Sequence, residues 1–103
     1  MRDFEFYYEI EAIKNNIIDA IIESPKDIPA FYQECAQKLA YYQAEYRIGI
    51  YKKEATQGVQ RILFILRNIK PLNPKITKRI NRLYDETIRR INEYDNSQRE
   101  ESY

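Results

Sequence analysis

Apolar residues recur along this chain with the three- and four-residue spacing that is typical of α-helices. Over residues 3–23 one row holds five large apolar side chains, which are Phe6, Ile10, Ile13, Ile17 and Ile21. Residues at this spacing lie along one side of a helix, because an α-helix completes a turn in about 3.6 residues. The pattern therefore predicts a first helix over 3–23 with one face in a core.

The apolar pattern of the next segment changes sides in its middle. Its first row is Ile28, Tyr32, Cys35, Leu39, Tyr42 and Tyr46. Its second row is Ile48, Tyr51, Ala55, Val59, Ile62, Leu66 and Ile69. At about 100° per residue the two rows point in nearly opposite directions. The change falls beside Gly49, so we expect either one continuous helix over 27–69, the arrangement we favour, or a break near Gly49.

Proline residues indicate where the second and third helices begin. Pro29 cannot lie deep inside a helix, because it lacks an N–H and clashes with the preceding turn. We therefore expect Asp27 as the N-cap of the second helix. Asn73 is a suitable N-cap for a third helix with Pro74 in its first position. One face of this helix, which we expect to end near 94, holds Ile76, Ile80, Leu83, Thr87, Ile91 and Tyr94.

The elements together predict an all-α protein. We expect three long helices, about 3–23, 27–69 and 74–94, in a single domain over 1–95. The alternative is a four-helix bundle, if the second helix breaks near Gly49. Residues 96–103 are polar, and we expect a frayed, disordered tail there.

A continuous second helix also predicts self-association. Two opposed apolar rows would expose more apolar surface than two flanking helices cover, and such surface favours association. Ala36, Ala40 and Ala44 form a row of small side chains that would let another helix approach closely. We expect a homodimer; alternatively the third helix, or solvent, covers this row.

Charge is distributed unevenly, although the net charge is only +1. Residues 1–34 carry three basic and eight acidic groups, residues 35–83 eleven and two, and residues 84–103 three and six. Between Glu54 and Asp85 there are seven basic residues and no acidic one. This basic segment surrounds the expected turn before the third helix, and such segments attract polyanions.

The basic segment supplies the candidate site for nucleic acid or another anion, which is Lys70, Lys75, Lys78, Arg79 and Arg82. The last four fall on the side of the third helix opposite its apolar face, so they should be exposed together. Further along this helix Asp85–Arg89 and Glu86–Arg90 are favourable i,i+4 pairs, so we expect Arg89 and Arg90 to be structural. Cations in the first turns of a helix are unfavourable unless an anion is near, and a phosphate there would also meet free backbone N–H groups. The alternative is that these cations pair, within the chain or across a dimer, with an acidic row on the first helix, which holds Glu5, Glu9, Asn16, Asp19 and Glu23.

Two aromatic residues lie off the apolar rows. Tyr41 and Phe64 are therefore candidates for contact with a protein partner, whereas Tyr42, Tyr46 and Tyr51 lie on the rows and are expected in the core. An adaptor or inhibitor that uses these aromatics and the acidic face of the first helix is the alternative to a nucleic-acid-associated protein.

The residue types argue against catalysis. The chain has no histidine and one cysteine, so it lacks the commonest general base and an ordinary zinc site. Cys35 lies on an apolar row, which favours a buried thiol. The two glycines form no phosphate-binding loop, and no Glu is followed by an acidic residue three positions later. We expect no enzyme activity, no catalytic residues, no metal site and no cofactor.

The sequence also indicates a compartment. No apolar run approaches the roughly 20 residues that span a bilayer, so no membrane association is expected. The acidic start MRDFEFYYEI does not resemble a signal peptide, and a lone cysteine forms no internal disulfide. We expect a cytoplasmic protein.

Overall fold

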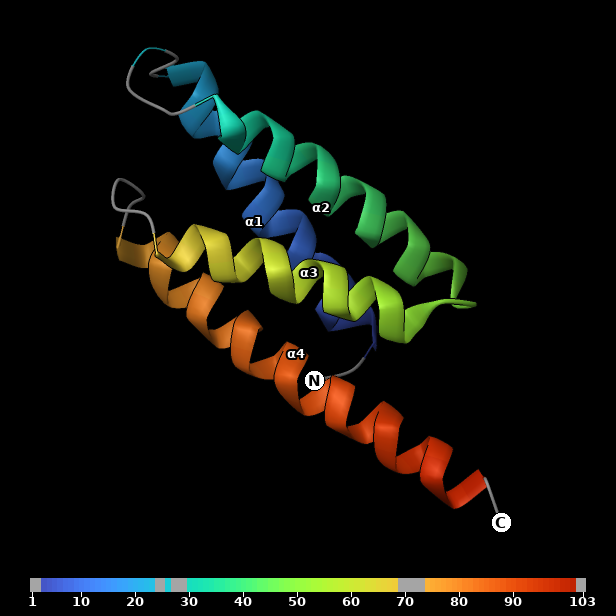
Figure 1. The fold of residues 1–103 in the computed structure, drawn as a ribbon. Coiled ribbons are helices and arrows are strands. Elements are labelled where there is room, and N and C mark those ends of the chain that lie inside the picture. Colours follow the sequence, from blue (N-terminus) through green and yellow to red (C-terminus); the bar gives the residue numbers. More distant parts are fainter. Residues whose placement is uncertain (1–2, 24–25, 27–29, 69–73, 102–103) are drawn as a thin grey trace.

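The computed structural model describes residues 3–23, 26, 30–68 and 74–101, and these residues form helices joined by turns, with no strand among them. The helices are α1 (Asp3–Glu23), α2 (Phe31–Ile48), α3 (Lys52–Arg67) and α4 (Pro74–Glu101) (Figure 1). The predicted all-α class is confirmed, as are the bounds of the first helix and the start of the last at Pro74. The described part of the chain thus has the four-helix arrangement.

The favoured continuous helix over 27–69 is wrong, because the chain reverses at Gly49. Gly49 has φ 87°, a left-handed conformation that glycine adopts without the steric cost of a Cβ, and its N–H donates a 3.2 Å hydrogen bond to the carbonyl of Glu45. This bond closes the last turn of α2. A new helix starts where the N–H of Ala55 donates to the carbonyl of Tyr51 at 2.9 Å.

The start of the second helix also differs from the prediction. The helix begins at Phe31 rather than at 27, with Ala30 at the N-cap. The predicted caps Asp27 and Asn73 lie outside the described residues, as does Pro29.

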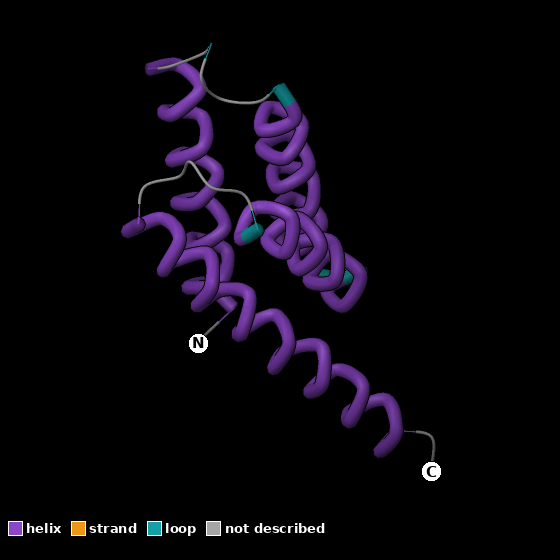
Figure 2. The backbone as a smooth tube through the Cα atoms, turned by 60° about the vertical axis from the view of Figure 1, so that its left-hand side comes forward, coloured by secondary structure: helices purple, strands orange, loops and turns teal. Residues whose placement is uncertain are grey.

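Each helix runs antiparallel to its neighbours along the chain. Side-chain contacts show this directly, because the start of one helix meets the end of its neighbour: Phe6 packs against Tyr46, Lys52 lies over the ring of Tyr46, and Lys53 bonds to Asp95. Glu9 of α1 meets Arg79 of α4, which closes the ring of four. The result is an up-down-up-down bundle, visible in two orientations in Figures 1 and 2.

The reversal at Gly49 turns both predicted apolar rows toward one core. From the first row Tyr32, Cys35, Leu39 and Tyr46 are buried, and from the second row Ala55, Val59, Ile62 and Leu66. Ile48 and Tyr51 were expected in the second row, but they are exposed because they flank the turn. Opposed rows on one straight helix were the main argument for a homodimer, and the bundle removes that argument. The dimer stays a prediction.

Helix α4 is longer than predicted. It continues from the expected end near 94 to Glu101, so residues 96–101 of the predicted tail are helical, while 102–103 lie outside the described residues. At 1.5 Å per residue, 28 residues span about 42 Å. Figure 1 shows its C-terminal end projecting past the other helices, and the molecule measures 55 × 23 × 20 Å. An ion pair between Lys53 and Asp95 joins this distal part of α4 to α3.

Gly58 has a different role from Gly49. It lies inside α3, where the second apolar row keeps its phase, and the ring of Tyr42 packs directly against its backbone. A Cβ at position 58 would overlap that ring. Glycine therefore allows α2 and α3 to approach closely at this point.

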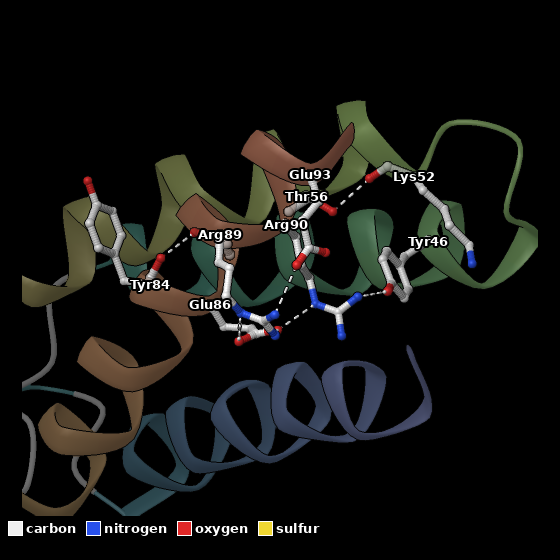
Figure 3. Close-up of polar contacts among 9 residues, drawn as sticks. Tyr46, Lys52, Thr56, Tyr84, Glu86, Arg89, Arg90 and Glu93 are labelled. Carbon is white, nitrogen blue, oxygen red and sulfur yellow. Dashed lines mark hydrogen bonds and ion pairs between the residues drawn. The ribbon is translucent and has the colours of Figure 1, made fainter. Parts of the chain in front are cut away.

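The inner face of α4 carries a buried arginine. Arg90 is 5% exposed, and its Nη1 donates a 2.8 Å hydrogen bond to the hydroxyl of Tyr46 on α2 (Figure 3). Its Nε donates to Glu86 at 3.0 Å, which confirms the predicted pair of these two residues. The guanidinium also lies over the ring of Phe6, 4.6 Å from its centroid. Opposite charge, a hydroxyl and an aromatic face thus compensate for the burial of this cation.

The second arginine that we expected to be structural has a different partner. Arg89 was expected to pair with Asp85, but it bonds instead to Glu86 and, at 3.0 Å, to Glu93. The carboxylate of Glu86 raises the pKa of Arg89 through a hydrogen bond and its charge. Glu86 therefore holds both arginines of this turn.

A second polar contact crosses the interface of α1 and α2. Gln43 is 4% exposed, and its amide donates to the carboxylate of Glu11 while its Oε1 accepts a 3.2 Å bond from Lys14. Lys14 also pairs with Glu11 at 3.2 Å. The hydrogen bond from Gln43, assisted by Lys14, lowers the pKa of Glu11 below its ordinary value of 4.5.

Candidate nucleic-acid interface

A groove with basic walls lies where the first turns of α4 pack beside α1. We call it the basic groove; its volume is about 490 Å³, and its lining residues are Asn16, Lys75, Ile76, Lys78, Arg79 and Arg82. Asn16 comes from α1 and the others from α4. Helix periodicity groups the four cations, because positions 75, 78, 79 and 82 fall within two turns of α4. No carboxylate is among the described residues that line the groove.

The cations of the basic groove differ in how strongly the protein engages them. Lys75, Lys78 and Arg82 are exposed, as expected. Lys78 and Arg82 make no ion pair with any residue that the structure describes. Arg79 is half-buried and its Nε lies 3.4 Å from a carboxylate oxygen of Glu9. Lys70, the remaining predicted cation, lies outside the described residues.

The pair of Arg79 and Glu9 bears on the alternative interpretation of the basic segment. One member of the predicted acidic row indeed neutralises one member of the basic cluster, and it does so within the chain. Asp19 and Glu23 of the same row are exposed. Intramolecular pairing thus accounts for Arg79 and leaves Lys78 and Arg82 to face solvent.

The position of the groove favours anions on physical grounds. The groove surrounds the N-terminal turns of α4, where backbone N–H groups lack helical partners and the helix dipole is positive. Glu9 already offsets the charge of Arg79, but the repulsion between Lys78 and Arg82 is unfavourable until an anion screens it. Asn16 adds an uncharged amide that can donate a hydrogen bond to a phosphate oxygen. The groove can therefore hold phosphate groups through both charge and hydrogen bonds.

The two predicted partner residues are exposed but lie apart from each other. Tyr41 on α2 is 61% exposed, and its ring meets that of Tyr42 edge-on at 5.3 Å. Phe64 on α3 is 53% exposed, and its ring lies 6.2 Å from that of Tyr84 on α4. The guanidinium of Arg67 covers the same Tyr84 ring, 4.7 Å from its centroid. Tyr41 and Phe64 thus belong to two separate aromatic clusters.

The groups most relevant to chemistry lie in unreactive surroundings. Cys35 is buried, and burial together with the charge of Glu34 raises the pKa of its thiol. Burial likewise raises the pKa of Tyr32. Within the described ranges, no three His, Cys, Asp or Glu side chains group in a way that could hold a metal ion. Among the helices described, none combines the length and the apolar character needed to cross a membrane.

Two functional features were missed by sequence reasoning. Asn16 was grouped with the acidic row of the first helix, whereas it contributes to the basic groove. Gln43 was not singled out, although its position four residues after Leu39 and three before Tyr46 places it on the first apolar row. A polar residue on an apolar row was the signal that could have predicted a buried hydrogen bond.

Comparison with known proteins adds no further assignment. No protein-family model, no curated protein and no solved structure matches this chain. The basic groove and the exposed aromatic residues are therefore the features of this chain that bear on its function.

Proposed function

We propose that this protein is a small non-enzymatic binding protein that associates with nucleic acid through the basic groove. The observation that carries the proposal is the convergence of four cations at the N-terminal turns of α4, two of which, Lys78 and Arg82, have no ionic partner among the described residues. Contacts of this kind go to backbone phosphates, which every sequence shares. We therefore expect weak sequence preference and a strong dependence on salt.

The test compares two charge-matched double variants. In Lys78→Gln/Arg82→Gln both unpaired cations of the groove are neutralised, while Arg79 keeps its pair with Glu9. In the control, Lys38→Gln/Arg47→Gln, the same charge is removed from exposed positions on α2. Affinity for single-stranded and duplex DNA is measured by fluorescence anisotropy between 50 and 200 mM salt, a range over which counterion release changes affinity strongly.

The expected result is a change in slope. Each phosphate contact contributes about 0.7–0.9 to the slope of log K against log salt, so the groove variant should lower the slope by about 1.4–1.8. The control variant should leave the slope nearly unchanged. Equal losses in the two variants would indicate a general charge effect, and no measurable binding by the parent protein would reject the proposal.

A protein-binding adaptor or inhibitor is the second candidate function. The observation that favours it is the exposure of Tyr41 and Phe64, because large aromatic side chains at the surface are enriched in protein interfaces. This candidate predicts that Phe64→Ala abolishes the capture of a protein partner and leaves affinity for DNA unchanged. Nuclease treatment before capture separates the two candidates, since a partner held only through nucleic acid is then lost.

Sedimentation of the same variants addresses the proposed homodimer. If cations of the basic groove pair with Asp19 or Glu23 of a second copy, Lys78→Gln/Arg82→Gln should weaken the dimer at micromolar concentration. If the protein is a monomer at all concentrations, the dimer is rejected, and the exposed Ile22, Ile48 and Ile50 need no partner copy.

A further inference from the structure

A second concave site lies between α2 and α3, next to the turn at Gly49. We call it the tyrosine pocket; its volume is about 270 Å³, and its lining residues are Tyr41, Tyr42, Glu45, Tyr51, Glu54 and Ala55. The first three occupy one turn of α2 and the last three begin α3. The reversal at Gly49 brings these two short segments face to face.

The lining of the tyrosine pocket is acidic and aromatic. Three phenol rings and two carboxylates line it, and no basic side chain is among the described lining residues. Neither Glu45 nor Glu54 makes an ion pair with any residue that the structure describes. The faces of aromatic rings are also electron-rich. Both kinds of group therefore make the potential in the pocket negative.

The lysines nearest to the pocket in sequence are engaged elsewhere. Lys52 follows Tyr51 directly, but its Nζ lies over the ring of Tyr46, 5.5 Å from the centroid (Figure 3). Lys53 bonds to Asp95 on α4. Neither lysine lines the tyrosine pocket, so no residue among those that the structure describes supplies a cation there.

Two of the three rings of the pocket make contacts within the protein before any ligand binds. Tyr42 packs on the backbone of Gly58, where the absence of a Cβ makes room for its ring. Tyr41 meets Tyr42 edge-on at 5.3 Å. Preorganised side chains lose little conformational entropy on binding, which favours affinity.

We infer that the tyrosine pocket binds an ammonium or guanidinium group presented by a basic segment of a partner protein. Cations bind over aromatic faces, and nearby carboxylates add direct charge pairing. An anion would be repelled by the two glutamates, and an apolar ligand would desolvate them without compensation. The volume is below the roughly 300–1,000 Å³ of sites for whole small molecules, and it suits the end of one side chain. The inference deepens the second candidate function and does not rest on the basic groove.

The test is a titration followed by NMR. The ¹⁵N-labelled protein is titrated with a short Gly/Ser peptide that carries two arginines, and in parallel with the same peptide carrying neutral citrulline. The arginine peptide should give saturable shifts of backbone amides in residues 41–45 and 51–55, whereas the citrulline peptide should not. Tyr51→Leu should weaken binding about 2- to 30-fold, which corresponds to the range of cation–π energies. Glu54→Gln should weaken binding up to about 5-fold, which corresponds to the range for an exposed ion pair.

Matched controls come from α1. Tyr8→Leu and Glu23→Gln change an exposed tyrosine and an exposed glutamate away from the pocket, so affinity for the arginine peptide should stay the same. Equal shifts with the citrulline peptide, or equal losses in the α1 controls, would overturn the inference. Shifts of the same amides with protein concentration alone would also overturn it, because a second copy would then be the occupant.

The experiments distinguish the absence of a cation site in the tyrosine pocket from the absence of a protein-binding function. A negative titration, together with partner capture that depends on Phe64, would reject the cation site and leave that candidate standing. A positive titration without capture of any protein partner would reject the adaptor or inhibitor function, for which capture is the test. It would leave the cation site standing.

Discussion

The hydroxyl of Tyr46 and the guanidinium of Arg90 form a 2.8 Å hydrogen bond between α2 and α4, across 44 positions of sequence. Tyr46 also packs its ring against Phe6 of α1, at 4.9 Å between centroids. The Nε of Arg90 donates a hydrogen bond to Glu86 on its own helix. Three helices therefore meet at one buried cation. This contact joins α2 to α4, two helices that do not follow each other along the chain.

Replacing Tyr46 with phenylalanine tests that link. The ring and its packing remain, but the buried guanidinium loses one hydrogen-bond acceptor, so Tyr46→Phe should lower the free energy of unfolding by about 1.5–3 kcal/mol. Chemical denaturation measures this value. Tyr41→Phe removes a hydroxyl from an exposed side chain and should change stability by less than about 0.5 kcal/mol. Equal effects of the two substitutions would contradict the role of the Tyr46 hydroxyl.

We predict that Gly49 contributes to stability only because it adopts a left-handed backbone conformation. At φ 87° a Cβ would meet only Lys52, at an ordinary 3.7 Å, so Gly49→Ala should cost about 1–2 kcal/mol from the left-handed conformation itself. Gly49→Asn should cost less, because asparagine tolerates this region. Urea unfolding distinguishes the two. Stabilisation by alanine would instead indicate that a continuous helix over this segment is accessible.

We predict that Gly58 affects stability through its packing against Tyr42. The substitution Gly58→Ala should destabilise the parent protein, but it should stabilise a variant that lacks the Tyr42 ring. In the parent protein Gly58→Ala places a Cβ in the Tyr42 ring, and such overpacking costs about 1–3 kcal/mol. With Tyr42→Ala as background all the ring atoms that would overlap the new Cβ are gone, including Cδ1, and alanine at position 58 should stabilise the helix by up to about 1 kcal/mol. A double-mutant cycle by denaturation measures the coupling. Independent, additive effects would contradict the contact.

Stability should fall in acid as Glu11 becomes protonated. Its pKa in the folded protein is lower than the ordinary 4.5, because Gln43 and Lys14 donate hydrogen bonds to the carboxylate. The charged form is thus favoured by folding, so this contribution is present above pH 4.5 and is lost as pH falls through the lowered value.

NMR titration of the Glu11 carboxyl carbon tests this assignment. In Gln43→Met the largest cause of the shift is removed, so the pKa of Glu11 should rise toward 4.5 and stability should depend less on acid pH. Gln37→Met changes an exposed glutamine of the same helix and should leave the titration of Glu11 unchanged. An unaltered titration in Gln43→Met would show that Gln43 is not the cause.

Periodicity alone predicted the helical segments and most of the core. The row from Phe6 to Ile17 is buried as expected, because an amphipathic helix has one apolar face whatever its partners are. The break at Gly49 was harder to predict, since glycine occurs both inside helices, as at position 58, and at their ends. Only packing between segments decides which role it takes, and that depends on residues distant in sequence.

In the candidate site, too, residue spacing predicted which side chains share one face of a helix, but not which helices come into contact. The grouping of Lys75, Lys78 and Arg82 on one side of a helix followed from their spacing. The pair of Arg79 with Glu9 required knowledge of which face of α1 lies against α4, which no local pattern supplies. Arg90 was expected to be structural, but its burial depends on Tyr46 and Phe6 from two other helices.

The order of the helices in the bundle also affects how fast the chain folds. Each helix packs on the one that precedes it, so most native contacts join residues close in sequence, and loop closure costs little entropy. The contact of α1 with α4 joins the first and last helices, and it is less extensive than the three interfaces between successive helices. Helical proteins rich in local contacts fold within microseconds to milliseconds. The bundle is therefore expected to assemble rapidly as two hairpins, with the docking of α4 on α1 as the slow, entropically demanding step.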